Sequence, residues 1–301
     1  MNNLGFLFGC DSKNNNIVDA TFLEEYDYLK SRDVKVFIID LENILSKDDV
    51  LIEKSLYPVS LIYRGWMLSY QQYEKLYQLL LTKNYQLMVS PTAYRESHYL
   101  DKWYPKLSDL TAKTYFSEGT PSEEKIKEML SKFDHKSIIV KDYVKTLNYE
   151  WYESCFIKDA SNNEEALKVI NNFINKQGDS FSGGLVLREY LDIKKTNRHF
   201  KEGDGLENEE VRVFCLDKEP FCFISYWSGG VALRDRNFLG IIDKCNVLSS
   251  PFYTLDLAKL STGEWIIIDV GDGQVSQLRG YDVEKFYDCF LSVLNISYQI
   301  Y

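Results

Sequence analysis

The segment FYTLDLAKLSTGEWIIIDVGDGQ, residues 252–274, predicts a β-hairpin that carries two acids. Two strand-forming runs flank the polar turn Ser261–Gly263, which is the pattern of paired antiparallel strands. Asp256 lies inside the first run, where strand propensity disfavours it, and Asp269 closes the second. Cross-strand neighbours lie about 5 Å apart, and two carboxylates that close need a cation or a shared proton between them. Hard oxygen ligands of this kind suit Mg²⁺; the alternative is a sheet with solvated acids along one edge.

The composition is that of a folded globular protein with enough apolar material for about two or three compact units. Of the 301 residues, 45% are hydrophobic and 27% are charged, and 22 Tyr and 17 Phe add aromatic surface. The formal net charge is -10. Because binding to a phosphate backbone needs a basic face, we expect no nucleic-acid partner.

Cysteine and histidine usage disfavours a disulfide framework and a zinc site. The six cysteines are scattered without a CxxC pair, and the three histidines lie far apart in the sequence. The first nine residues lack the basic and apolar regions of a secretory signal, and no run approaches 18 apolar residues. We therefore expect no membrane segment and a cytoplasmic location.

Strand-like and helix-like segments alternate through the first third of the chain. Apolar runs predict strands at 4–8, 34–41, 61–66 and 85–89, and helical spacing marks 21–31 and 70–82. This alternation predicts a small, mainly parallel α/β sheet, whose ligands bind beyond the carboxyl ends of the strands. Arg64 and Arg95 fall at such ends, where an arginine can hold a substrate carboxylate through two hydrogen bonds. Ordinary structural or surface arginines are the alternative.

The rest of the chain mixes helices with hairpin strands. We expect helices at 120–133, 164–176 and 281–293, and strands at 137–140, 185–191, 211–216 and 220–227. Residues 194–209 are polar and contain glycine, so we expect an exposed loop there.

Cationic side chains precede the acidic hairpin. Lys141 and Lys145 follow an apolar strand, where lysine can meet a phosphate as a mobile charge; solvated surface lysines are the alternative. Arg212 lies within a strand and needs a carboxylate or phosphate partner. Together with Asp256 and Asp269, these side chains can neutralise a triphosphate and its Mg²⁺, which is what phosphoryl transfer requires of a protein.

The ordered motifs resemble the ATP-grasp superfamily and, within it, the clade named for a signature of two arginines and one lysine. They are Arg64-Gly65-Trp66, Lys141-Asp-Tyr-Val-Lys145 with Trp151, Glu210-Val-Arg212-Val-Phe214, Asp256, and Asp269-Val-Gly271-Asp272-Gly273-Gln274. The resemblance implies an α/β plus α+β architecture, the ATP-grasp fold. A pre-ATP-grasp α/β domain would cover 1–110, a small ATP-grasp subdomain 111–186, and a large subdomain with the metal site 187–301.

The resemblance also implies roles for single residues. The implied ATP contacts are Lys141, Lys145, Glu189, Tyr190, Leu191 and Arg212, with 189–191 as the hinge that meets adenine through its backbone. Lys141 and Arg212 would act on the reacting phosphates. Asp256 and Asp269 would bind Mg²⁺. The usual final Glu-x-Asn reads Asp269-Val-Gly271 here, so we expect Asp272 or a water to complete the metal shell.

The implied activity is that of an ATP-dependent carboxylate–amine ligase, which forms an amide or peptide bond through an acylphosphate. The absent amide at Gly271 supports an alternative, an ATP-grasp-like nucleotide-binding module without ligase turnover. A phosphotransferase to a hydroxyl is a third reading, disfavoured because the chain lacks a kinase-type catalytic loop and a Gly-rich nucleotide loop. The residues do not distinguish a small-molecule, peptide or protein substrate.

Overall fold

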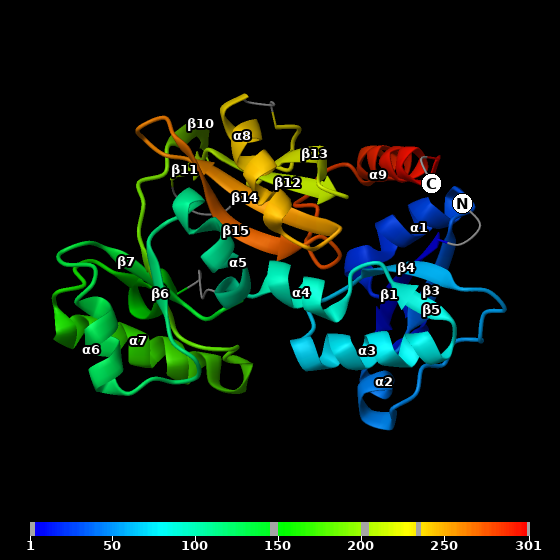
Figure 1. The fold of residues 1–301 in the computed structure, drawn as a ribbon, viewed down its shortest axis with the longest axis horizontal. Coiled ribbons are helices and arrows are strands. Elements are labelled where there is room, and N and C mark those ends of the chain that lie inside the picture. The colour runs from blue at the N-terminus through cyan, green and yellow to red at the C-terminus, as the bar shows by residue number, and fades with distance from the viewer. Residues whose placement is uncertain (1–3, 145–149, 200–204, 233–235, 300–301) are drawn as a thin grey trace.

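Three β-sheets follow one another along the chain, each with its own helices (Figure 1). The structure, a computed structural model, describes residues 4–144, 150–199, 205–232 and 236–299. The sheets occupy residues 4–87, 114–189 and 210–272, in the order of the three predicted regions. The domain boundaries at 110 and 186 stay predictions. Within the described residues, no helix has the length and apolarity to cross a membrane.

The first sheet is mainly parallel, as the alternating pattern predicts. Its strands are β3 (Lys35–Ile39), β1 (Leu4–Asp11), β4 (Val59–Arg64) and β5 (Tyr85–Leu87), in that spatial order, with β2 (Asn14–Val18) antiparallel to β1. Its helices are α1 (Leu23–Ser31), α2 (Leu41–Lys47) and α3 (Tyr70–Thr82). Ser69 and Gln72 form a reciprocal capping box that fixes the start of α3. Helices α4 (Pro91–His98) and α5 (Leu100–Leu107) then lead to the second sheet.

The second sheet is antiparallel and lies on one side of the molecule in Figure 1. Its order is β6 (Thr114–Phe116), β9 (Val186–Glu189), β7 (Ile138–Lys141) and β8 (Phe156–Ile157). Helices α6 (Glu123–Leu130) and α7 (Asn163–Gln177) bury their apolar faces in one cluster with these strands. The helix limits agree with the apolar spacing because Ser122 and Asn162 cap the two N-termini.

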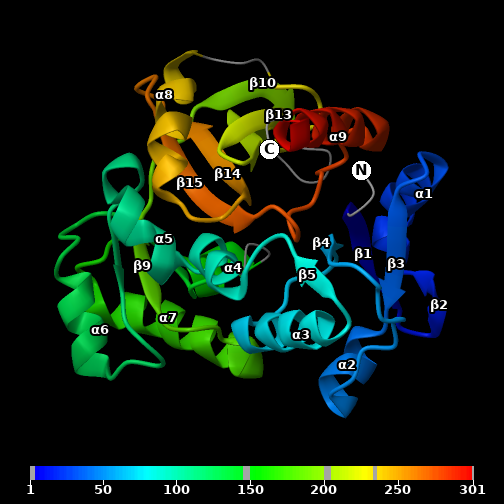
Figure 2. The ribbon, with the colours of Figure 1, turned by 45° about the vertical axis from the view of Figure 1, so that its right-hand side comes forward.

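The third sheet holds the acidic hairpin. Its order is β13 (Glu219–Ser225), β12 (Glu210–Leu216), β14 (Phe252–Lys259) and β15 (Trp265–Asp272), all antiparallel. Helix α8 (Arg236–Lys244) covers one face, and α9 (Val283–Gln299) follows the sheet. In Figures 1 and 2, α9 lies between this sheet and α1. Phe6 of β1 contacts Phe290 of α9 with ring centroids 5.9 Å apart, so the C-terminal helix shares a core with the first sheet.

One expectation is wrong. Residues 194–209 contain a two-stranded antiparallel ribbon, β10 (Lys195–His199) and β11 (Leu206–Asn208), where we expected a loop. The strands are short and mostly polar, so neither shows the alternation that marks a half-buried strand. The hairpins at 210–225 and 252–272 and the helices near 123–130, 163–177 and 283–299 are confirmed.

Candidate functional site

A row of charged side chains crosses the third sheet. Arg212 of β12, Asp256 of β14 and Asp269 of β15 are direct cross-strand partners, so all three share one face. The pairing of β14 with β15 shifts at this point: Asp256 lies opposite Asp269, whereas Leu257 lies opposite Ile267. Ile268 is therefore the extra residue of a β-bulge, which brings Asp269 onto the face of Asp256.

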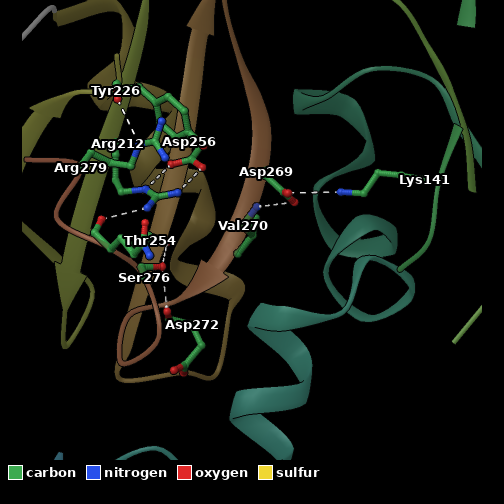
Figure 3. Close-up of polar contacts among 11 residues, drawn as sticks. Lys141, Arg212, Tyr226, Thr254, Asp256, Asp269, Val270, Asp272, Ser276 and Arg279 are labelled. Carbon is green, nitrogen blue, oxygen red and sulfur yellow. Dashed lines mark hydrogen bonds and ion pairs between the residues drawn. The ribbon is translucent and has the colours of Figure 1, made fainter. Parts of the chain in front are cut away.

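Arg212 holds Asp256 in a two-pronged ion pair (Figure 3). Its Nε and Nη2 donate to the two carboxylate oxygens, each at 2.8 Å, and Nη1 donates to the carbonyl of Gln277 at 3.0 Å. Burial lowers the pKa of Arg212, but the Asp256 carboxylate outweighs it and holds this pKa above its usual value. Arg212 is thus a permanent cation on this face.

Lys141 brings a second cation from the second sheet. Its Nζ lies 3.2 Å from Oδ2 of Asp269, although Lys141 itself is only 4% exposed at the end of β7. Oδ1 of Asp269 accepts a hydrogen bond from the backbone N–H of Val270 at 3.1 Å. Figure 3 shows this pair spanning the space between the two sheets. The sheets therefore meet at the two acids that the sequence singles out.

A cavity of about 290 Å³ opens beside the row. Arg212, Asp256 and Asp269 line it together with Arg279 and Tyr226. The Arg279 guanidinium lies 4.3 Å from the ring centroid of Tyr226, and its Nε donates to the Tyr226 carbonyl at 3.2 Å. The other wall comes from the first domain, at residues 65–67 and His98.

Three residues of this region have no counterpart in the sequence-based prediction. Arg279 and Tyr226 lie outside the quoted motifs, and Arg188 occupies an apolar strand that predicts only core packing. Arg188 is buried, and burial lowers its pKa; its Nη2 donates to the Ile267 carbonyl at 3.1 Å, beside Asp269. An arginine inside a buried strand was the available signal, because such a charge needs a partner.

Asp272 does not join the two acids, which corrects the expectation that it completes a metal shell. It pairs with Tyr253, on the opposite face of the sheet from Asp256. One carboxylate oxygen accepts the backbone N–H of Gln274 at 3.1 Å, and the other is buried without a partner among the described residues. Burial raises the pKa of Asp272 to about 7. Figure 3 shows its carboxylate turned away from the row.

The position of the absent amide is already filled. A Cβ on Gly271 would lie 2.6 Å from Oγ1 of Thr254 and 3.0 Å from Oγ of Ser276. These two hydroxyls are 2.8 Å apart and both side chains are buried. Residue 271 is therefore glycine for lack of space, and two hydroxyl groups stand beside Asp269 where the family pattern has an amide.

Arg64 is also corrected: it is an internal bridge and not a surface for a substrate. It is 1% exposed and binds both oxygens of Glu25 at 2.8 and 2.9 Å. Its Nη1 lies within 3.1 Å of the carbonyls of Gly273, Gln274 and Ser276. Strand β4 ends against the third sheet, and this contact uses the guanidinium completely. Arg95, in contrast, lines a second and larger cavity.

The implied adenine hinge lies apart from the cavity beside Arg212. Glu189 accepts from Lys136 at 2.5 Å, Tyr190 is half exposed against Phe156, and the Tyr190 N–H donates to the Ser137 carbonyl. Neither they nor Leu191 line that cavity. Lys145 falls outside the described residues.

The acids fit a magnesium site whose shell a ligand completes. Among the described residues, no cluster of three or more His, Cys, Asp and Glu side chains could hold a metal by itself. Mg²⁺ in nucleotide sites is usually held by one or two carboxylates, with phosphates and waters in the remaining positions. Asp256 and Asp269 are such a pair, and in this structure Arg212 and Lys141 neutralise them.

Solved structures of ATP-grasp proteins share this fold along nearly the whole chain. D-cycloserine synthetase DcsG aligns with a TM-score of 0.62 at 13% identity, covering 97% of this chain and 99% of its own. A RimK domain ATP-grasp protein from Sphaerobacter thermophilus DSM 20745 aligns at 0.60, with 11% identity and coverage of 96% and 99%. The ATP-grasp ligase PsnB, complexed with precursor peptide PsnA2 and AMPPNP, aligns at 0.59, with 11% identity and 96% coverage of both chains.

At these identities the alignments show the fold alone. A search of curated proteins gave no match. The model of an ATP-grasp domain family, the third of the clade named for two arginines and one lysine, matches residues 130–289. The match covers more than half of the chain and all of the charged row. This chain therefore belongs to the ATP-grasp superfamily, in family 3 of that clade.

Proposed function

We propose that this protein is an ATP-dependent, ADP-forming carboxylate–amine ligase. The observation that carries the proposal is the paired arrangement of Arg212 on Asp256 and Lys141 on Asp269, two cations and two acids from two sheets beside one cavity. Such a set matches a magnesium–triphosphate group, with the cations on phosphate oxygens and the acids on the metal. We further propose that Lys141 and Arg212 belong to the clade's signature.

Nucleotide binding requires the ion pairs to rearrange. Arg212 and Lys141 would turn from the carboxylates to the phosphate oxygens, and Asp256 and Asp269 would then hold Mg²⁺, which neutralises charge on the transferring phosphoryl group. Arg279 lines the same cavity and offers a third cation toward it. The protein thus supplies position and charge rather than a nucleophile.

The proposed reaction has two steps. A carboxylate oxygen of the substrate attacks the γ-phosphorus, and the bond to the leaving ADP breaks, giving an acylphosphate. An amine then attacks the acyl carbon and loses a proton, and phosphate leaves with the oxygen that the carboxylate contributed. Exclusion of water from the cavity protects the acylphosphate from hydrolysis.

The transferred oxygen is the sharpest test. Purified protein, ATP and Mg²⁺ are incubated with amino-acid and peptide panels whose carboxylates carry ¹⁸O. We expect ADP together with phosphate that contains one ¹⁸O atom, measured by mass spectrometry. ADP release with unlabelled phosphate would mean hydrolysis or transfer to another group, and would contradict the ligase proposal.

Matched variants connect the activity to the row. Asp256→Asn and Lys141→Met should reduce ADP release at least about 100-fold, because each removes a charge that contacts the transferring group. Lys127→Met, on the exposed face of α6, is the control and should keep full activity. Equal rates in all three variants would remove the charged row from the mechanism.

The second candidate is a nucleotide-binding module without turnover, which the glycine at 271 favours. It predicts that Mg²⁺ and ATP raise the melting temperature while no panel member causes ADP release. Labelled phosphate from any substrate would exclude it.

A further inference from the structure

A second cavity, of about 1090 Å³, lies between the first domain and the second sheet. The start of α3 and helices α4 and α5 form one wall, and residues 116–118 and 179–183 form the other. Figures 1 and 2 both show the start of α3 close to the end of α7. The cavity shares Met67 and His98 with the smaller cavity beside Arg212, so the two adjoin.

Three buried polar atoms around this cavity have no hydrogen-bond partner within the described part of the chain. They are Nε of Arg95, Oδ1 of Asp101 and Oγ of Ser117, and all three residues line the cavity. Buried polar groups in folded proteins are nearly always paired, with protein, water or ligand. Three such atoms from three segments of the chain, gathered at one cavity, point to a polar ligand.

The arginine of this set is held in place for binding. The Arg95 guanidinium lies 5.0 Å from the ring centroid of Tyr70, which fixes its plane against an aromatic face. Asp101 uses Oδ2 for an ion pair with Lys102 at 2.7 Å, which leaves its buried Oδ1 to accept from something else. One cationic donor, one anionic acceptor and one hydroxyl therefore face the same space.

From these features we infer that the large cavity binds a peptide chain with a free carboxylate as the substrate of the ligase, an inference that rests on the proposed function. Arg95 takes a carboxylate of the peptide, while Asp101 and Ser117 pair with its backbone N–H and C=O groups. The reacting group reaches past Met67 and His98 to the charged row.

Size and charge favour a peptide over smaller or more anionic ligands. Cavities of about 300–1,000 Å³ hold drug-sized molecules, so a single amino acid would leave most of this one to water. The charged lining contains Arg95 and Lys102 but also Asp101, Glu118 and Asp179. Three acids against two bases disfavour a phosphate-rich ligand and suit a chain with mixed polar groups.

The test is retention of peptides by the intact protein. The probe is a pool of tetrapeptides randomised over all residues except Cys, compared with the same pool after methyl esterification of every carboxylate. After equilibrium dialysis, mass spectrometry should show the native pool retained at least 10-fold more strongly than the esterified pool. Equal retention, or no retention of either, would overturn the inference.

Two variants locate the binding. Arg95→Gln and Ser117→Leu, on opposite walls, should each lower retention at least 10-fold, and circular dichroism should show unchanged folding. Arg32→Gln, an exposed arginine that follows α1, is the matched control and should retain the pool like the unaltered protein. Retention that survives both cavity variants would place the peptide elsewhere and contradict the inference.

The assay separates this inference from the ligase proposal. Peptide retention without ADP release in any mixture would support the cavity and contradict the ligase. ¹⁸O-labelled phosphate from free amino acids, with no retained peptide, would support the ligase and overturn the peptide inference.

Discussion

Arg212 and Lys141 each pair with one of two neighbouring acids. The Arg212–Asp256 pair uses two parallel hydrogen bonds and is largely shielded from water, at 12% and 14% side-chain exposure. Lys141 reaches Asp269 from another sheet. The four side chains thus balance one another's charge, and a ligand that brings both Mg²⁺ and phosphates can exchange all partners at once.

Arg212→Lys tests whether the forked geometry matters beyond the charge. Lysine keeps the charge but cannot donate two parallel bonds, so we expect about a 10- to 100-fold lower kcat/KM for ATP, equal to about 1.4–3 kcal/mol. Steady-state ADP release measures it, with Arg32→Lys on the surface as control. Full activity in Arg212→Lys would show that only the charge is needed.

Gly271→Asn, which would restore the family's amide, should destabilise the protein and not improve turnover. The new Cβ would lie 2.6 Å from Oγ1 of Thr254, which is only 1% exposed, and overpacking of this kind costs about 1–3 kcal/mol. Urea unfolding measures the loss. The control is Gly240→Ala, where α8 leaves open space and the helix should gain about 0.5–1 kcal/mol. Higher turnover in Gly271→Asn would mean that the hydroxyl pair does not fill the ligand position.

At the scale of elements, strand β15 divides its acids between two faces. The bulge at Ile268 brings Asp269 onto the face of Asp256, and three residues later Asp272 emerges on the other face beneath the first domain. Nothing in the run Trp265–Ile268 shows a bulge, because three isoleucines fit either register. Strand pairing and the proximity of Asp256 to Asp269 could thus be predicted from the sequence, whereas the role of Asp272 could not.

Asp272→Asn should remove a pH dependence of stability. The folded protein holds the Asp272 proton up to about pH 7, whereas the unfolded chain releases it near its ordinary pKa of 3.8. Stability is therefore lost as the pH rises from about 4 to about 7, by up to about 4 kcal/mol, and stays level above that range.

Urea unfolding at pH 5 and pH 8 measures this slope in both proteins. The Asn variant should lose less stability between the two pH values than the unaltered protein. Identical slopes would mean that Asp272 is ionised in the folded state over the whole range.

At the scale of the whole molecule, buried charges join the three sheets. Arg64 and Glu25 tie the first sheet to the turn after β15, and Lys141 ties the second sheet to the third. The order of the three sheets follows from local patterns, which the sequence carries. Contacts between sheets do not, because residues 25 and 64 meet residues 273–276 only after folding. For the same reason Arg64 resembled a substrate arginine in the sequence.

Arg64→Met should therefore cost stability, about 3–5 kcal/mol, because it leaves the Glu25 carboxylate buried and unpaired. Thermal and urea unfolding measure the loss, and the double variant Arg64→Met with Glu25→Gln should recover part of it. Arg32→Met, which breaks an exposed pair, should leave the melting temperature nearly unchanged. Unchanged stability in Arg64→Met together with a raised KM for the carboxylate substrate would return Arg64 to the substrate site.

The most direct measurement of the central claim is electron paramagnetic resonance of Mn²⁺, as a substitute for Mg²⁺, with the ATP analogue AMPPNP. Asp256 and Asp269 supply only two carboxylates, so we predict weak Mn²⁺ binding alone and strong binding with the nucleotide. Asp256→Asn and Asp269→Asn should each abolish the nucleotide-dependent signal. Undiminished Mn²⁺ binding in both variants would contradict the account.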